Sequence, residues 1–177
     1  LYESEGCLSL HALFVERGGA VAPDRFAQLF AAAVERAAVE FPPSARDAAT
    51  HAAVGGARAM AAFRAAAGEG VVYSPAAATH LVVFAPPPSQ PPYLLPRSVG
   101  VLAVVAPAAA LAYLRRHGLA LEAVATAGRR EDVVNMAVDA GAARLARFGE
   151  LQAPLAAANH GGRARVADFV RWITDET

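Results

Sequence analysis

Residues 98–117 read SVGVLAVVAPAAALAYLRRH, and this stretch decides the fold. Its first part, 98–105, is an apolar run rich in valine, which predicts a strand. Pro107 suits the first position of a helix, and Gly118 suits the position just past its end, so we expect a helix over 107–117. A strand followed at once by a helix is the repeating unit of a parallel sheet.

The same alternation extends on both sides of this stretch. Strands that alternate with helices predict an α/β fold, in which helices flank a parallel sheet joined by right-handed crossovers. In such folds ligands sit beyond the carboxyl ends of the strands. Ser44 is the expected cap of the second helix. Further strands are predicted at 8–15, 71–73, 81–84, 121–125 and 143–148, and further helices at 23–41, 44–67, 130–140 and 163–174.

Composition narrows the class of protein. The 177 residues suit one domain, and the 55% hydrophobic and 18% charged fractions exclude a disordered chain. Sixteen basic and sixteen acidic residues give no net charge, which argues against a nucleic-acid or anionic-membrane binder. No apolar run is long enough to span a membrane, so we expect a cytoplasmic protein. Six prolines within 86–96 predict an extended surface loop.

Residue types and spacing alone identify no clear nucleotide-binding loop, metal site or nucleophile. Gly55-Gly56 and Gly161-Gly162 are isolated pairs and form no nucleotide-binding loop. The five histidines lack the spacing of metal ligands, so no metal site is expected. Cys7 is the single cysteine, and its position beside a predicted strand favours a small core residue. Glu3 and Glu5 would raise the pKa of its thiol if they lay close.

Longer stretches near both ends of the chain resemble sequence motifs of known protein families. Residues 6–16, GCLSLHALFVE, resemble the catalytic cysteine segment of the aldehyde dehydrogenase superfamily, in which the cysteine precedes a strand ending in Val-Glu. The segment is more similar to the bacterial long-chain acyl-CoA reductase family, which includes the reductase subunit of bioluminescence; here Leu10 replaces a proline of that family. Near the other end, RFGELQAP at 147–154, NHGGR at 159–163 and DFVRW at 168–172 resemble further motifs of the same family.

This resemblance implies a fold and a domain organisation. Residues 1–177 would form a single catalytic domain with a parallel, Rossmann-like sheet similar to that of aldehyde dehydrogenases. In that family the part that binds the cofactor lies mostly before the catalytic cysteine. We therefore expect the chain to be a fragment that lacks its upstream cofactor-binding domain, which would explain the missing glycine loop. The implied cofactor is NADPH, with its main binding residues upstream.

The resemblance also implies a reaction. The Cys7 thiolate would attack the carbonyl of an acyl-CoA, or of another acyl thioester, and coenzyme A would leave. Hydride from NADPH would reduce the Cys7 thioester, and the collapsing oxyanion would release a fatty aldehyde. Cysteine suits this sequence because it is both a good nucleophile and a good leaving group. The implied partners are the acyl-CoA, the upstream half, and either further copies of the chain or an acyl-transfer subunit.

Secondary site residues follow from the matched motifs. His160 is expected at the mouth of the active site, where it would assist the leaving coenzyme A, or else as an ordinary loop residue. Gly161 replaces an aspartate of the family, which weakens a proton-relay role for His160. Gln152 matches the family but could be structural. His11 is interpreted as a core or pocket histidine, and Phe169 with Trp172 as core residues.

Two other functions stay open. One is an aldehyde-oxidising dehydrogenase, which would need a glutamate base from upstream. The other is a relative that lost its activity and serves as an interaction subunit. The change from His-His-Asp-Gly in the family to AsnHisGlyGly at 159–162 gives mild support to the second.

Overall fold

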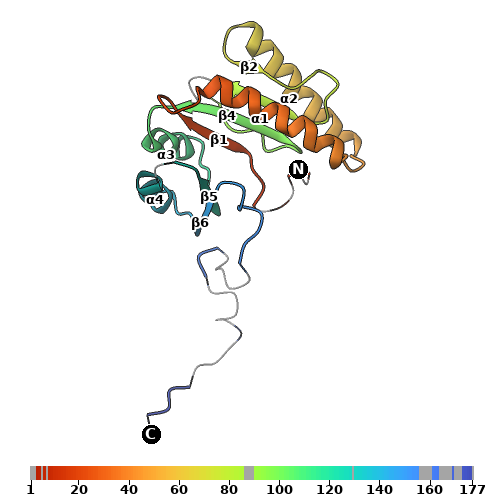
Figure 1. Ribbon diagram of the computed structural model, residues 1–177. Coiled ribbons are helices and arrows are strands. Elements are labelled where there is room, and N and C mark those ends of the chain that lie inside the picture. The colour runs from red at the N-terminus through yellow and green to blue at the C-terminus, as the bar shows by residue number, and fades with distance from the viewer. Residues whose placement is uncertain are drawn as a thin grey trace. The chain divides into compact units, whose positions relative to one another are not determined.

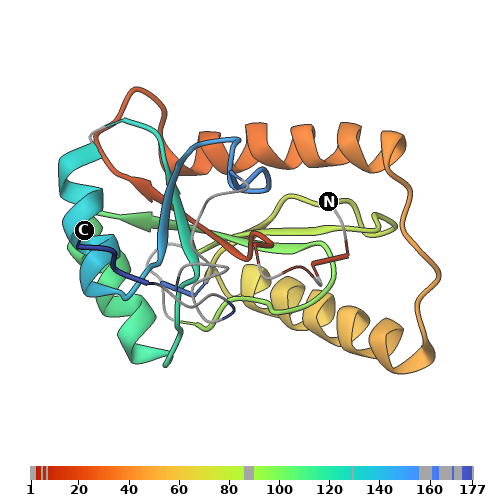
Figure 2. The same cartoon turned by 90° about the horizontal axis from the view of Figure 1, so that it is seen from below.

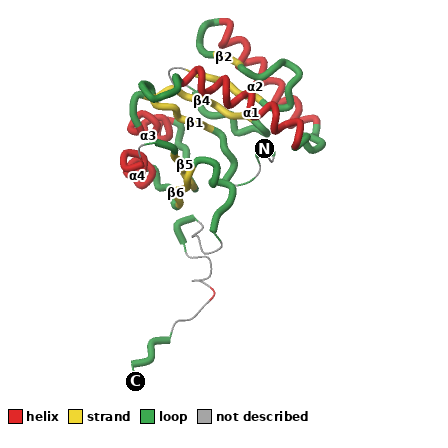
Figure 3. Tube along the Cα trace, viewed as in Figure 1, coloured by secondary structure: helices red, strands yellow, loops and turns green. Residues whose placement is uncertain are grey.

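The computed structural model describes residues 3–4, 6, 8–85, 90–128, 130–155, 161–163, 169 and 173–176. They form an α/β protein, which divides into two compact units, Leu1–Tyr113 and Leu114–Thr177 (Figure 1). The first unit contains β1 (Ala12–Glu16), α1 (Pro23–Glu40), α2 (Ala48–Ala66), β2 (Val71–Val72), β3 (Leu81–Ala85) and β4 (Ser98–Val104). Helix α3 (Pro107–Arg116) crosses the boundary, and the second unit holds β5 (Ala123–Thr126), α4 (Arg130–Asp139) and β6 (Arg144–Arg147) (Figure 3).

Strand β4 lies at the centre of the sheet in the first unit. The strand order is β1-β4-β3-β2, and β4 is parallel to both β1 and β3, with Gly100 opposite Ala12 and Val83. Every residue of β4 is buried, because the strand is covered on both faces. The predicted parallel pairing is confirmed for these strands. Strand β2 is antiparallel to β3, so the sheet as a whole is mixed.

Helices α1 and α2 cover opposite faces of this sheet. In Figure 2, α1 (orange) lies above the strands and α2 (yellow) lies below them. Alternate residues of β3 point to the two faces, because side chains along a strand alternate with a period of two. Val82 and Phe84 join the core beneath α1, whereas Leu81 and Val83 pack with Ala61 of α2. The α1 core contains Leu13, Ala27, Ala31, Val34, Val82, Phe84, Val99, Val101 and Ala103.

The start of α2 corrects one prediction. The helix begins at Ala48, and its cap is Asp47, whose carboxylate accepts a hydrogen bond from the Thr50 backbone N–H at 2.6 Å. Ser44 lies before the helix, where its backbone N–H donates to the Glu3 carboxylate instead. Asp47 satisfies an N–H of the first turn that would otherwise lack a partner, which fixes the helix start at this point.

The second unit contains a strand–helix–strand arrangement. Strands β5 and β6 are parallel, with Ala123 opposite Arg144 and Thr126 opposite Arg147, and α4 connects them. These predicted elements are confirmed. Among the described residues, β5 and β6 form a two-stranded parallel sheet, in addition to the four-stranded mixed sheet of the first unit.

Other predictions fall on the last residues and on the proline-rich loop. Most of the predicted helix at 163–174 lies outside the described residues. Phe169 is described and is 86% exposed, so its predicted place in a core is wrong, whereas Trp172 lies outside the described residues. Of the loop at 86–96, the described part, 90–96, contains no helix or strand, as its prolines predict. No helix in the described ranges is long and apolar enough to cross a membrane.

Gly70 precedes β2 at a point of close backbone approach. Its φ of +150° is unfavourable for other residues, and an added Cβ would lie 2.5 Å from the Phe84 carbonyl oxygen. We predict that Gly70→Ala lowers the free energy of unfolding by about 1–3 kcal/mol in urea titrations, because backbone must shift. Gly56, inside α2, meets nothing within 4 Å, and Gly56→Ala should raise stability by about 0.5–1 kcal/mol. Equal changes in the free energy of unfolding for the two substitutions would contradict the claim that the backbone at Gly70 requires glycine.

His80, directly before β3, is a buried histidine with unsatisfied ring nitrogens. His80 is 2% exposed, and neither its Nδ1 nor its Nε2 has a hydrogen-bond partner among the described residues. Burial lowers the pKa of His80; the Glu35 carboxylate on α1 raises it, and Arg58 and Arg97 lower it further, so that the net shift is downward. The structure therefore holds His80 as a neutral imidazole.

This burial predicts a loss of stability in mild acid. A histidine in the unfolded chain has a pKa near 6.5, whereas folded His80 has a lower pKa. As the pH falls below about 6.5, the unfolded chain therefore binds a proton that the folded protein does not, and the free energy of unfolding decreases. This decrease ends once the pH is below the lowered pKa of folded His80. We expect the urea midpoint of the protein to fall from pH 7 to about pH 5, and to fall less in His80→Leu. The exposed His51 on α2 provides the control, because His51→Leu should keep the pH dependence of the parent. The same pH dependence in all three proteins would contradict the prediction.

Candidate active site

The segment around Cys7 turns sharply before it enters the sheet. Cys7 itself lies outside the described residues. On either side of it, the Ser9 N–H donates to the Gly6 carbonyl at 2.9 Å, which closes a turn over residues 6–9. The His11 carbonyl then accepts a hydrogen bond from the Gly100 N–H at 3.0 Å, and β1 follows. The predicted strand at 8–15 therefore begins later, at Ala12, because the preceding residues form this turn.

This segment enters the sheet from the amino end of β1. Because β1, β4 and β3 are parallel, their amino ends share one edge of the sheet. The sequence pattern predicted ligands at the opposite edge, beyond the carboxyl ends. Residues 8–11, which lead into β1, therefore lie at the amino edge.

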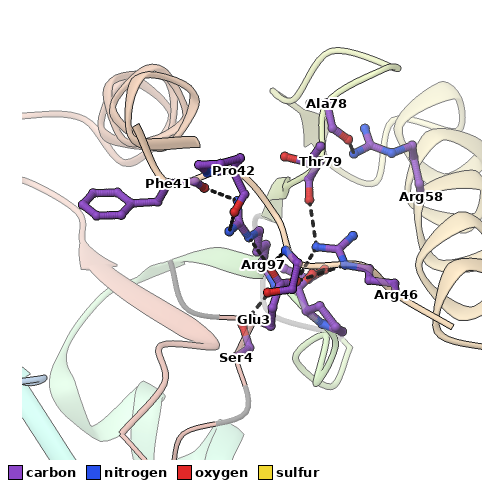
Figure 4. A network of polar contacts seen from close by, with 12 residues as sticks. Glu3, Ser4, Phe41, Pro42, Arg46, Arg58, Ala78, Thr79 and Arg97 are labelled. Carbon is purple, nitrogen blue, oxygen red and sulfur yellow. Dashed lines mark hydrogen bonds and ion pairs between the residues drawn. The ribbon is translucent and has the colours of Figure 1, made fainter. Parts of the chain in front are cut away.

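The Glu3 carboxylate holds the start of the segment in place (Figure 4). Its Oε2 accepts hydrogen bonds from Arg46 Nε at 3.0 Å and Nη2 at 2.8 Å. Its Oε1 accepts from Arg97 Nε at 2.9 Å and from the Ser44 backbone N–H at 3.2 Å. Both oxygens are therefore occupied by donors from the connection between α1 and α2 and from the residue before β4.

Arg97 connects the same segment to other parts of the first unit. Its side chain is 3% exposed, and its Nη1 and Nη2 donate to the carbonyls of Phe41 and Pro42 at 2.8 and 3.1 Å. Its backbone N–H donates to Ser4 Oγ at 3.0 Å (Figure 4). Arg97 was not singled out from the sequence, although a charge directly before a fully apolar strand is a signal that could have identified it.

The Glu3 carboxylate has a lowered pKa because cations and hydrogen-bond donors surround it. Burial raises the pKa of Glu3, but the hydrogen bonds from Arg46 and Ser44 and the charges of Arg46 and Arg97 hold it below its usual value. Glu3 is thus ionised at neutral pH and surrounded by two cations. Its charge is therefore balanced locally, whereas Glu5 and Cys7 lie outside the described residues.

The other predicted site residues belong to different units. In the first unit, His11 is half-buried just before β1, and its Nδ1 has no hydrogen-bond partner among the described residues. In the second unit, Gln152 is exposed, and the Gly161 N–H donates to Glu122 Oε1 at 3.1 Å. His160 lies outside the described residues. The grouping of these residues with Cys7 in one site stays a prediction.

A small cavity lies on the α2 face of the four-stranded sheet. Its volume is about 30 Å³, with Gly100 and Tyr93 among its lining residues. Tyr113 also lines it, and its hydroxyl donates to the Gln90 carbonyl at 2.6 Å. Burial, and then the charge of Tyr93, raises the pKa of Tyr113 to about 12, so it remains a neutral donor. This volume suits about one or two water molecules and not a long acyl chain.

The described part of the chain offers no metal centre: none of its His, Cys, Asp and Glu side chains form a group of three or more that could hold a metal ion. The expected absence of a metal site was based on sequence spacing alone.

Comparisons with known proteins identify the family. No curated protein matches the chain, and no solved structure does. The model of the acyl-CoA reductase (LuxC) family matches residues 1–172. The match spans both the cysteine segment at 6–16 and the motifs at 147–154, 159–163 and 168–172, on which the resemblance was based. The chain therefore belongs to the acyl-CoA reductase (LuxC) family.

Proposed function

We propose that this chain carries the acyl-transfer chemistry of an enzyme that reduces a long-chain acyl-CoA, or another acyl thioester, to a fatty aldehyde with NADPH. The single observation that supports this most is the family match over 1–172, which includes the segment around Cys7. Cys7 is also the one cysteine in the sequence, so a cysteine thioester on this chain can form nowhere else.

The proposed first half-reaction transfers the acyl group from coenzyme A to Cys7. The Cys7 sulfur, as a thiolate, attacks the acyl carbonyl and forms a C–S bond, while the bond to the coenzyme A sulfur breaks. Coenzyme A leaves as a thiolate and takes up the proton that Cys7 released. A thioester exchanges for a thioester, so the step is nearly balanced in energy and needs no oxidant or reductant. The backbone N–H of Cys7 is our proposed donor to the oxyanion.

The residues described here do not fit a dinucleotide cofactor. A glycine-rich loop between a strand and a helix would be expected at such a site. Between β1 and α1 the glycines are the adjacent pair Gly18-Gly19, which lacks the spacing of such a loop. Between β4 and α3 the chain reads Val105-Ala106, and between β5 and α4 the one glycine is Gly128. We therefore propose that NADPH is bound by residues upstream of this chain, and we derive no step through the cofactor.

Further residues and partners complete the proposal. His160 would assist the leaving coenzyme A, while Gly161, Gln152 and His11 would contact the substrate or line its site. Their support is the position of each in, or next to, a matched family motif. We also propose that the protein acts in the cytoplasm, as an oligomer or with an acyl-transfer subunit, within the aldehyde dehydrogenase superfamily.

The proposal is tested by intact-mass spectrometry after incubation with tetradecanoyl-CoA. We expect the mass of one acyl group to be added to the protein, and no addition in Cys7→Ala, because the thiol is the acceptor. Alkylation with iodoacetamide is the control, since it shows that the Cys7 thiol is reactive in the same preparation.

Two results would count against the proposal. An adduct that persists in Cys7→Ala would show that another group accepts the acyl chain. A protein that is alkylated at Cys7 but never acylated, even when joined to its upstream sequence, would favour the interaction-subunit hypothesis instead.

A further inference from the structure

We propose that His80 makes the packing of α2 sensitive to acid: when its imidazole takes up a proton, α2 and the loop at residues 74–80 separate from the four-stranded sheet, while α1 stays in place. We call residues 74–80 the His80 loop. All the residues that carry this device are described and lie in the first unit, and none of them takes part in the proposed acyl transfer.

The His80 side chain lies in a position that suits only its neutral form. It is buried, and neither ring nitrogen has a hydrogen-bond partner among the described residues. The next residue, Leu81, is fully buried, and its N–H donates to the Arg97 carbonyl at 3.0 Å. A protonated imidazole carries two N–H donors and a charge, and it needs acceptors or water for both. The protonated ring is therefore stable only if it leaves this position.

The charges around His80 also oppose a proton on the ring. Burial is the largest influence on the pKa of His80 and lowers it; the Glu35 carboxylate on α1 raises it, and Arg58 on α2 and Arg97 before β4 lower it. Glu35 is exposed, so water and salt screen its attraction. The charge of Arg97 is already paired with Glu3 at 2.9 Å. A proton on His80 would thus add a cation beside two others.

Arg58 connects α2 to the residue that titrates. Its Nη1 donates to the Pro75 carbonyl at 2.9 Å, and its Nη2 donates to the carbonyls of Ala78 and His80 at 2.8 and 2.6 Å. Figure 4 shows the Arg58 side chain reaching from its helix to Ala78. One guanidinium of α2 therefore satisfies three carbonyls of the His80 loop, and a displacement of His80 breaks the contact of the helix with this loop.

Two further contacts hold the loop. Arg46, in the connection before α2, donates from Nη2 to the Thr79 carbonyl at 3.3 Å, and its own charge is balanced by Glu3. On the other side of the loop, the buried Ser74 Oγ accepts from the Val82 N–H at 2.8 Å. The loop thus depends on side chains of α2, of its preceding connection and of the loop itself, and α1 provides none of these bonds.

Helix α2 has a weaker apolar attachment to the sheet than α1 has. Ala61 is its one buried residue, and two adjacent glycines within the helix lower its intrinsic stability. Helix α1 contributes Ala27, Ala31 and Val34 to the core on the opposite face. Because buried apolar contacts set the free energy of local opening, α2 opens more easily than α1 once the Arg58 contacts are lost.

The test is hydrogen–deuterium exchange at pH 7 and at about pH 5.5, with rates corrected for the intrinsic effect of pH on exchange. A histidine in the opened form has a pKa near 6.5, so one pH unit below this value favours that form by about tenfold. We expect the protection of amides in α2 and in the His80 loop to fall by about tenfold, and that of α1 by less than about twofold.

Substitution of His80 should abolish the effect of acid. In His80→Leu, which cannot take up a proton, we expect the protection of α2 to differ by less than about twofold between the two pH values. If this variant does not fold, His80→Asn keeps a polar side chain that does not titrate in this range, and it should behave in the same way. The exposed His51 lies on α2 itself, and His51→Leu should keep the acid-dependent loss of the parent.

Substitution of Arg58 tests the link between the helix and the loop. Arg58→Gln loses the guanidinium bonds to the three carbonyls, so the protection of α2 should fall by about tenfold or more already at pH 7. Arg36→Gln, at an exposed position of α1, is the matched control and should leave the protection of both helices unchanged.

Three results would overturn the proposal. In the unsubstituted protein these are equal protection of α2 at both pH values, or an equal loss of protection in α1 and α2. The third is an acid-dependent loss that persists in His80→Leu or in His80→Asn. The comparison of the two helices in the unsubstituted protein decides the question even if neither variant folds.

Discussion

The buried guanidinium of Arg97 is the constraint on which the first unit depends. A cation with so little exposure needs a counter-charge and acceptors for its N–H groups, and it obtains them from Glu3 and from the carbonyls of Phe41 and Pro42. These acceptors belong to separate segments of the chain. The requirements of one side chain therefore fix the start of β4, the connection between α1 and α2, and the segment before β1 relative to one another.

Strand β4 makes this arrangement rigid. It is buried along its whole length, it pairs with β1 and β3 on its two sides, and α1 and α2 cover the two faces of the sheet. A residue fixed directly before such a strand has little freedom. Ser4 and His11 are hydrogen-bonded to Arg97 and Gly100, so described residues on both sides of position 7 contact the start and the interior of this buried strand.

Local sequence signals predicted most of the elements because their causes are local. Pro23 and Pro107 mark the first residues of α1 and α3, and the valine-rich run became β4. Predictions that depended on distant pairing were weaker. Nothing near 121–148 indicates that β5 and β6 pair in a sheet separate from the four-stranded one. Ser44 and Asp47 are both residue types that can cap a helix, so the sequence alone did not decide that α2 begins at Ala48 with Asp47 as its cap.

The candidate site could be predicted only in part for the same reason. Cys7 was identified through resemblance, because neither its neighbours nor its spacing mark it as a nucleophile. The partnership of Glu3 with Arg97 spans 94 positions of sequence, and no local pattern indicates it. A single arginine beside an apolar strand suggests that some buried partner exists, but only the fold shows which carboxylate it is.

The central claim is that an acyl group on Cys7 is an intermediate on the way to an aldehyde. The most direct measurement is to isolate the acylated protein, extended by its upstream sequence, and to quantify the products after addition of NADPH. The account predicts one equivalent of fatty aldehyde for each acyl group and a recovered Cys7 thiol. Release of the acyl group as free fatty acid at the same rate with and without NADPH would contradict it.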